Sequence, residues 1–397
     1  MGEAATTMQA VLEAPGVEGL EVLHLIPCDD ATNDKDAVTG LVRRIVAADD
    51  SPVTGAFNVL DLGKVAELYA AWRRGLNGVP PYYAVKCNAN PALLSALAAL
   101  GSGFDCASPA EMDAVLALGV AADRIVYANP CKPESHIAYA ASVGVNVTTF
   151  DSVEEVGKIK RLHPGCELLL RLRVSDAGAA LLDLGTKYGA TEEEVEPLLR
   201  AARDAGLAVT GVSFHVGTAV SRVGVYDMRL RRRSACPPCA FQDACDVVNA
   251  ALERHFGDMP GGVEVIGEPG RYFAETPFTL AARIFGKRTR GEVREYWIDD
   301  GFYGTLCCIH VENYVPRPVP VSLECCATAA GETTHPSTVF GPTLDSLDVV
   351  VKGYQLPELG IGDWLVFHDV GAYTTALSCN FNGFSASDLK TYLAYSV

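Results

Sequence analysis

The stretch that decides the fold reads YYAVKCNANPALLSALAALGSGFDCASPAEMDAVLAL and runs from Tyr82 to Leu118. It contains two short apolar segments, at residues 82–86 and 104–107, and each is followed by a helix-like run, at 92–100 and 110–118. Short apolar segments that alternate with helical patterns are typical of a parallel sheet with crossover helices. We therefore expect an α/β fold.

This alternation continues through most of the chain. Further strand-like segments lie at residues 124–128, 145–150, 167–174, 209–215 and 263–268, with helical segments at 136–142, 153–162 and 192–205. Eight strands at roughly 30 residues per unit close a (β/α)8 barrel, and seven can be counted here. Near 218–240 the sequence shows no apolar strand, which leaves open whether the barrel lacks one strand there.

The pattern changes after about residue 290, where strands follow one another without helices. These strand-like segments lie at 295–298, 319–325, 349–353, 364–368 and 389–395. Such an all-β pattern predicts a separate β domain. A further strand-like segment, at 20–26, precedes the barrel and could pair with that domain. The expected organisation is an N-terminal segment at 1–55 that joins the β domain, a barrel at 56–290 and a C-terminal β domain at 291–397.

Charge and composition exclude several classes of function. The 49 acidic and 32 basic side chains give a formal net charge of −17, which opposes binding to nucleic acid or anionic membranes and favours small cationic ligands. No apolar stretch approaches the roughly 18 residues that span a bilayer, and we expect a cytoplasmic protein. Of the 13 cysteines, Cys236, Cys239 and Cys245 form a loose group without a second CxxC or a histidine pair, so no metal site is expected.

Three strand ends carry side chains suited to chemistry. Lys86 ends the first barrel strand, on the face where such barrels build active sites, and its amine could form a Schiff base. His215 ends a later strand with a ring that could stack on a pyridine. Gly-Glu-Pro-Gly-Arg at 267–271 ends the last one, where Glu268 could pair with a pyridine nitrogen and Arg271 with a phosphate. Taken singly, each has a plain structural interpretation, such as a solvated lysine or a surface ion pair.

Together these motifs resemble those of the plant-type ornithine decarboxylases, within the family of ornithine, diaminopimelate and arginine decarboxylases. The resemblance covers nearly the whole chain. It implies an alanine-racemase-like barrel with a β domain, pyridoxal 5'-phosphate as cofactor and a homodimer with shared active sites. The implied reaction is the decarboxylation of L-ornithine to putrescine and CO2 in polyamine biosynthesis, with lysine as a second candidate substrate.

The resemblance also implies a role for individual residues. Lys86 would be the Schiff-base lysine, His215 would stack on the ring, and Tyr373 would hold the phosphate together with Arg271. The full set of implied cofactor contacts is Lys86, Asp105, Arg171, His215, Thr218, Glu268, Gly270, Arg271 and Tyr373. The implied substrate contacts are Glu312, Asp345 and Phe381, and the implied intersubunit ion pair is Lys187 with Asp348.

The chain departs from the family pattern in three places. Leu344 stands where the family has a cysteine that helps to protonate the product, and leucine can donate no proton. The glycine-rich phosphate turn expected near 218–240 is missing, and Glu312 replaces an aspartate. These departures leave a second hypothesis open, a catalytically impaired homologue that acts as a binding or regulatory protein. A racemase or diaminopimelate decarboxylase on the same fold is a third, although the segment at 381–384 resembles the ornithine enzyme more closely.

Overall fold

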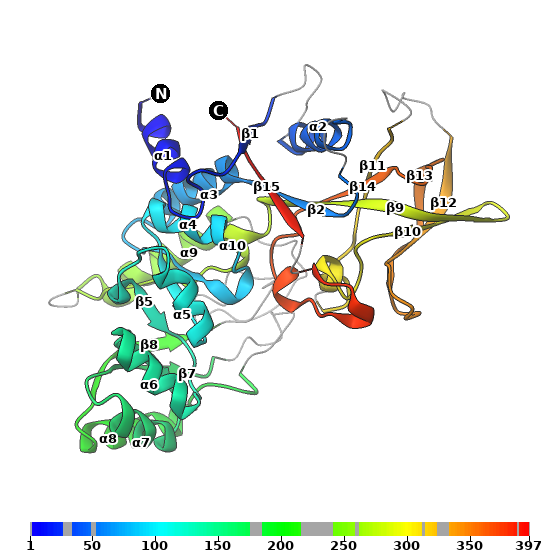
Figure 1. Cartoon of the computed structure of the whole chain (residues 1–397). Coiled ribbons are helices and arrows are strands. Elements are labelled where there is room, and N and C mark those ends of the chain that lie inside the picture. The colour runs from blue at the N-terminus through cyan, green and yellow to red at the C-terminus, as the bar shows by residue number, and fades with distance from the viewer. Residues whose placement is uncertain are drawn as a thin grey trace. The chain divides into compact units, whose positions relative to one another are not determined.

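The structure is a computed structural model that describes residues 2–26, 34–48, 53–174, 185–215, 241–258, 262–311, 314–323, 333–386 and 389–396. The chain divides into two compact units (Figure 1). The first, called here the β unit, comprises Met1–Leu68, Lys86–Leu100 and Gly270–Val397. The second, called the barrel unit, comprises Tyr69–Val85 and Gly101–Pro269. Each is built around its own sheet.

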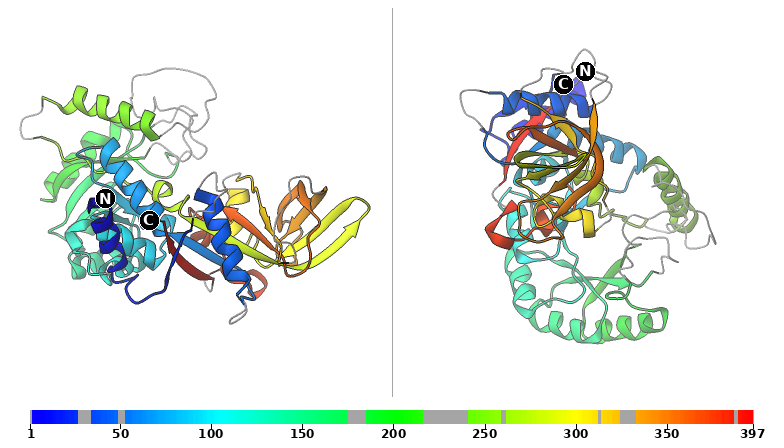
Figure 2. Two further views of the ribbon diagram at one scale, coloured as in Figure 1. Left: turned by 90° about the horizontal axis from the view of Figure 1, so that it is seen from above. Right: turned by 90° about the vertical axis from the view of Figure 1, so that its right-hand side faces the viewer.

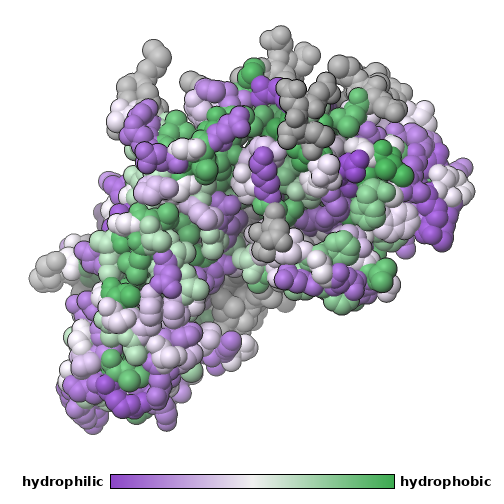
Figure 3. Space-filling view, in the orientation of Figure 1, coloured by the Kyte–Doolittle hydropathy of each residue, from purple (hydrophilic) through white to green (hydrophobic). Residues whose placement is uncertain are grey.

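The barrel unit contains a parallel sheet of six strands in sequential order. They are β3 (Tyr82–Ala84), β4 (Gly103–Cys106), β5 (Ile125–Tyr127), β6 (Val147–Phe150), β7 (Glu167–Leu172) and β8 (Ala208–Phe214). The crossover helices are α5 (Pro109–Leu116), α6 (Glu134–Val143), α7 (Val153–Leu162) and α8 (Glu192–Asp204). They follow the outer side of the curved sheet (Figure 2). Mainly hydrophilic side chains cover the end formed by α7 and α8 (Figure 3).

Apolar burial and helix caps explain why these elements form. The inner side chains of α7, Val156 and Ile159, pack with Phe150, Leu168 and Leu170 of the neighbouring strands in one buried cluster. Two of the crossover helices begin at a serine whose hydroxyl accepts a backbone N–H of the first turn, as preferred N-cap residues do. The local sequence therefore sets the helix starts, and the apolar faces place them on the sheet.

The segment expected as the last barrel strand pairs with the first. Tyr82 N donates to Gly267 O at 2.7 Å, and Ala84 N donates to Pro269 O at 3.0 Å, so β3 has neighbours on both sides. After β8 the chain continues through residues 216–240 to α9 (Phe241–Phe256). The question of a missing strand near 218–240 concerns residues outside those that the structure describes.

The β unit contains a mixed nine-stranded sheet. Its main path is β1 (Val22–His24), β15 (Lys390–Tyr395), β2 (Phe57–Asp61), β9 (Phe278–Arg290), β10 (Val293–Ile298), β12 (Thr334–Phe340) and β13 (Val349–Pro357). Off this path, β14 (Trp364–His368) pairs with both β9 and β11 (Val319–Val321). Helix α2 (Asp34–Val46) packs Leu41 and Val42 against the sheet residues Phe57 and Trp364.

The remaining described helices of the β unit are α1 (Gly2–Leu12), α4 (Pro91–Leu100), α10 (Arg271–Ala274) and α11 (Cys308–Val311), and α3 (Leu62–Gly75) crosses the boundary at residue 68. Helices α1 and α4 contact each other. Among the helices of the described residues, none has the length and apolar character that a membrane crossing requires.

The division into units differs from the expected barrel at 56–290. Strands β2 and β9 lie inside those limits but belong to the mixed sheet. The reason is the length of β9, whose 13 residues pair antiparallel with β2, β10 and β14. Such long-range pairing is invisible in the local pattern. The unit boundary consequently falls between Pro269 and Gly270.

Candidate active site

Lys86 lies on a tight turn directly after β3. The 3-10 turn Val85–Cys87 buries both of its end residues, whereas the side chain of Lys86 is exposed. Two bonds fasten this turn to a distant segment of the β unit: Tyr373 N donates to Cys87 O at 3.0 Å, and Asn88 Nδ2 donates to Gly371 O at 2.8 Å. The primary amine is thus presented by a backbone that is fixed on its C-terminal side.

Arg271 and Tyr373 lie together in the β unit, next to the Lys86 turn. The Arg271 guanidinium lies over the Tyr373 ring, 5.5 Å from its centroid, and Nη1 also pairs with Glu275 Oε1 at 3.0 Å. A Cβ at Gly270 would lie 3.1 Å from Cys87 Cβ and 3.4 Å from the Tyr373 hydroxyl. The close approach of these two side chains to the Gly270 backbone favours glycine at this position. Tyr373 itself has a positive φ of 53°, a conformation that functional sites often impose.

In the barrel unit, Arg171 is the centre of a second group. Its Nη1 donates to Ser213 Oγ at 3.1 Å, across the β7–β8 pair. Burial lowers the pKa of the Arg171 guanidinium. Three nearby carboxylates oppose this shift, those of Glu268, Asp105 and Asp151. Strand ends that are far apart in sequence thus place one half-buried cation near three acids.

Two members of this group were not expected from sequence, Asp151 and Ser213. Asp151 directly follows β6, and its carboxylate accepts the backbone N–H of Gly189 at 2.8 Å. Ser213 is buried near the end of β8, two residues before the half-buried His215. Their position at the carboxyl ends of strands is the signal that could have identified them.

Two of the implied substrate contacts, Asp345 and Phe381, lie in the β unit. The Tyr303 hydroxyl donates to Asp345, and the Tyr303 ring lies 4.5 Å from that of Phe381. Leu344 is 93% exposed, and its backbone N–H donates to Asn382 Oδ1 at 2.9 Å. Tyr303 was not expected from sequence. The implied residues Thr218 and Glu312 lie outside the residues that the structure describes.

The implied intersubunit pair, Lys187 and Asp348, has contacts within the chain. Asp348 is 1% exposed and accepts from the backbone N–H groups of Phe302 and Thr343, at 2.8 and 3.0 Å. Lys187 is exposed, with its Nζ 5.1 Å from the ring centroid of Tyr188. The carboxylate of Asp348 therefore organises its own loop, and the ion pair across subunits stays a prediction.

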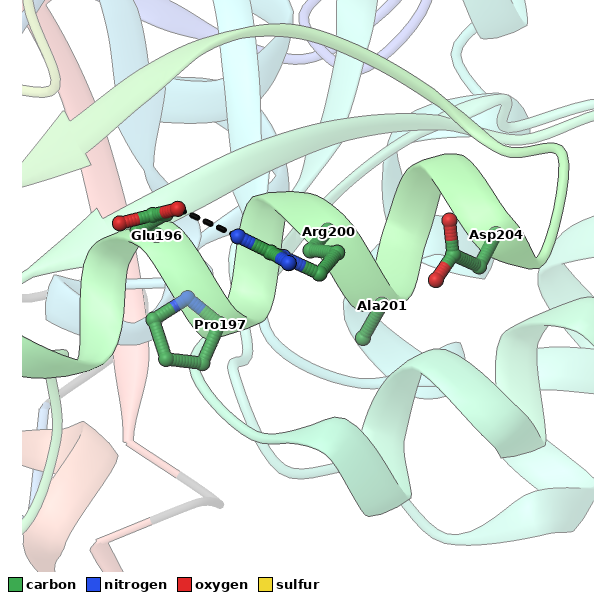
Figure 4. Close-up of a pocket in the computed structure, with 5 residues that line it drawn as sticks. All are labelled: Glu196, Pro197, Arg200, Ala201 and Asp204. Carbon is green, nitrogen blue, oxygen red and sulfur yellow. Dashed lines mark hydrogen bonds and ion pairs between the residues drawn. The ribbon is translucent and has the colours of Figure 1, made fainter.

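Among the described residues, neither a metal-binding group nor a surface pocket on α8 adds a member to the candidate active site. In the described part of the chain, no group of three or more histidine, cysteine or acidic residues is arranged to hold a metal ion. A surface pocket on α8 is lined by Glu196, Pro197, Arg200, Ala201 and Asp204, all from that one helix (Figure 4). Its charged side chains include an exposed Glu196–Arg200 ion pair, as on a solvated helix face.

Comparison with known proteins assigns the chain to a family. A family model described as "Pyridoxal-dependent decarboxylase, pyridoxal binding domain" matches residues 62–236. The ornithine decarboxylase of Nicotiana glutinosa, which is named chloroplastic, is 46% identical over 387 residues, 91% of this chain and 89% of the relative. The chain belongs to the ornithine decarboxylase family of pyridoxal-dependent decarboxylases. A family member from Mus musculus, also named ornithine decarboxylase, is 37% identical over 91% of this chain and 85% of the relative.

Solved structures of related decarboxylases share the fold. The arginine decarboxylase of Paramecium bursaria Chlorella virus has a TM-score of 0.79 and 32% identity, covering 90% of this chain and 100% of its own. The lysine decarboxylase of Selenomonas ruminantium has a TM-score of 0.76 and 31% identity, covering 92% and 96%. These likenesses confirm the expected class of fold, a barrel with an added β domain.

The cofactor of the family is pyridoxal 5'-phosphate, and the side chains present fit it chemically. An aldehyde requires a primary amine, which Lys86 supplies on its exposed turn. A phosphate dianion suits the Arg271 guanidinium, which directly follows Gly270 in the sequence. A pyridine N–H requires an acceptor such as the Glu268 carboxylate. The described residues therefore offer one group for each of these three functions, whereas the glycine-rich phosphate turn is missing from the sequence.

Proposed function

We propose that this family member decarboxylates L-ornithine to putrescine and CO2. The observation that carries the proposal is the Asp345 carboxylate, which accepts the Tyr303 hydroxyl and the Leu347 backbone N–H on a partly exposed loop, while the Tyr303 ring lies against that of Phe381. A carboxylate next to an aromatic ring suits the distal ammonium and methylene chain of a basic amino acid. The names of the tobacco and mouse relatives point to ornithine.

In this proposal each of the described side chains has a separate role. Lys86 Nζ would hold the cofactor, and Arg271 and Tyr373 would bind its phosphate. Glu268 would accept the pyridine N–H, and His215 would lie against the ring. When bound, pyridoxal phosphate supplies the electron sink that accepts the electron pair left as CO2 departs.

The product carbon must then receive a proton from a group other than Leu344. That side chain points into solvent and has no exchangeable proton. The alternative function, a binding or regulatory homologue, has less support. Lys86, Glu268, Arg271 and Asp345 are all present, and the curated relatives named here are decarboxylases.

The variant Asp345→Asn tests the substrate assignment. The substitution keeps the shape but removes the charge that would meet the distal ammonium, so we expect KM for ornithine to rise by about tenfold to a hundredfold. The measurement is CO2 release from ornithine, lysine and arginine as separate substrates. Asp113→Asn is the matched control, because Asp113 also accepts a tyrosine hydroxyl but lies on the outer surface.

Two outcomes would overturn the proposal. A clear preference for lysine or arginine would change the substrate. Failure to release CO2 from any of the three, in protein that still takes up pyridoxal phosphate, would support the binding or regulatory alternative.

We also propose a homodimer with shared active sites. Four large apolar side chains are exposed on the Asp345 loop and on the segment that carries Phe381. They are Leu344, Leu347, Phe381 and Phe384. Exposed apolar patches are typical of protein interfaces. If each site takes Lys86 and Asp345 from different subunits, mixing Lys86→Ala with Asp345→Asn protein should restore about a quarter of the wild-type activity at ornithine concentrations well below the wild-type KM, where Asp345→Asn protein alone is nearly inactive. Absence of any recovery after subunit exchange would contradict a shared site.

The cellular location stays a prediction. A cytoplasmic protein is expected from the sequence, whereas the two Nicotiana relatives are named chloroplastic. Localisation of the tagged full-length chain would distinguish the two compartments.

A further inference from the structure

Tyr303 lies on a turn that two buried carboxylates fix. Asp300 Oδ1 accepts the backbone N–H groups of Gly301 and Thr305, at 2.6 and 2.8 Å. Asp348 Oδ1 accepts the N–H of Phe302 at 2.8 Å. Both acids are at most 4% exposed. Because buried hydrogen-bonded carboxylates are costly to rearrange, the turn presents Tyr303 in a defined position.

Asp348 also fixes the loop that carries Asp345. Its Oδ2 accepts the backbone N–H and the hydroxyl of Thr343, at 3.0 and 2.6 Å. Its own N–H donates to Asp345 O at 3.1 Å. One buried carboxylate therefore joins the Tyr303 turn to the Asp345 loop, and the two side chains meet between fixed backbones.

The Tyr303 side chain is held in three directions. Its hydroxyl donates to Asp345 Oδ2, and its ring lies 4.5 Å from Phe381 and 4.7 Å from Phe302. Its carbonyl accepts the N–H of Cys379 at 3.0 Å, which ties it to the segment that bears Phe381. The other oxygen of Asp345 accepts the N–H of Leu347 at 3.0 Å. Both carboxylate oxygens are therefore engaged, which fixes the side-chain torsion.

This contact also affects charge. The hydrogen bond from Tyr303 holds the pKa of the Asp345 carboxyl below its ordinary value, and in return it raises the pKa of Tyr303 to about 12. The carboxylate is therefore ionised, and the phenol remains a donor, throughout the neutral range. A cationic group would meet a full negative charge there.

We propose that Tyr303 is a positioning and specificity-determining residue that fixes Asp345 so that it accepts the distal ammonium of a basic amino acid of one chain length. This inference rests on the proposed function of Asp345. A fixed carboxylate discriminates between ornithine and lysine, because the two ammonium groups differ by one methylene. A carboxylate that can rotate follows either ammonium, and discrimination is lost.

The variant Tyr303→Phe tests the inference, since it keeps the ring that packs on Phe381 and removes only the hydroxyl. We expect KM for ornithine to rise about tenfold while kcat changes by less than about threefold. The ratio of kcat/KM between ornithine and lysine should fall, and the acid limb of the kcat/KM profile should move to higher pH. Calorimetric titration with putrescine should show weaker binding without any turnover.

The control is Tyr139→Phe, which removes the hydroxyl that donates to Asp113 on the outer surface of α5 and α6. If Tyr303→Phe matches this control in selectivity, pH profile and putrescine affinity while Asp345→Asn still raises KM, the inference is overturned and the proposed function stands. If Asp345→Asn has no effect either, the proposed role of Asp345 fails and the inference fails with it.

Discussion

Replacement of Lys86 by alanine should lower kcat by more than about a thousandfold, because the chain loses the amine that holds the cofactor. CO2 release from ornithine measures the loss. Independently of turnover, reduction of the wild-type protein with borohydride should attach a pyridoxyl group to the peptide that contains Lys86, which mass spectrometry would locate. The turn around Lys86 is held by backbone bonds to Gly371 and Tyr373, so the variant should fold.

Two lysine variants control this experiment. Lys86→Arg keeps the positive charge but has no amine that can condense with an aldehyde, so it should be as inactive as Lys86→Ala. Lys160→Ala removes an exposed lysine of α7 and should keep full activity. Recovery of the pyridoxyl group on another lysine peptide of the wild-type protein would refute the assignment of Lys86.

Replacement of Lys132 by methionine should reduce the free energy of unfolding by about 3–5 kcal/mol, the usual cost of removing one partner of a buried ion pair. Lys132 Nζ donates to Asn129 O and Thr149 O, at 2.8 and 2.7 Å, and pairs with Glu155 Oε1 at 3.0 Å. Both side chains of the pair are 1% exposed. The variant would leave the buried Glu155 carboxylate with one cation fewer. It would also leave the carbonyls of Asn129 and Thr149 without the Lys132 donor.

Denaturant unfolding of the apo and holo proteins measures this loss. Lys158→Met is the matched control, because Lys158 pairs with the same Glu155 at 2.6 Å but its side chain is 23% exposed. It should cost clearly less. The double variant Lys132→Met with Glu155→Leu should recover part of the stability, since no charge then remains unpaired. Equal losses for the two lysine variants would show that burial does not determine the effect.

Much of the barrel unit could be predicted because its pattern is local. The segment expected as a helix at 153–162 is α7 with the same limits, and the strand expected at 145–150 contains β6. The unit boundary could not be predicted in this way. Strand β9 belongs to the mixed sheet because it pairs with β2, β10 and β14. Strands β2 and β14 lie far from β9 in the sequence, and β10 follows it after a turn that the local pattern does not distinguish.

The same contrast applies to the site. Lys86 and Glu268 could be predicted as site residues because reactive side chains at strand ends are conspicuous in a sequence. Tyr303 was missed because its partner Asp345 is 42 residues away, and a tyrosine between two glycines looks like an ordinary turn residue. Asp151 was overlooked although it follows a predicted strand, because its contacts with Gly189 and Arg171 are tertiary.

The pairing of β15 between β1 and β2 has a consequence for biosynthesis. Strand β15 is parallel to both, so two strands near the beginning of the chain are joined by one near its end. On the ribosome, β1 and β2 emerge long before this partner exists, and they cannot complete their sheet until β15, which follows the other strands of that sheet in the sequence, has been translated. The barrel unit can assemble from contiguous segments during elongation, whereas the β unit must close after synthesis of its last strand.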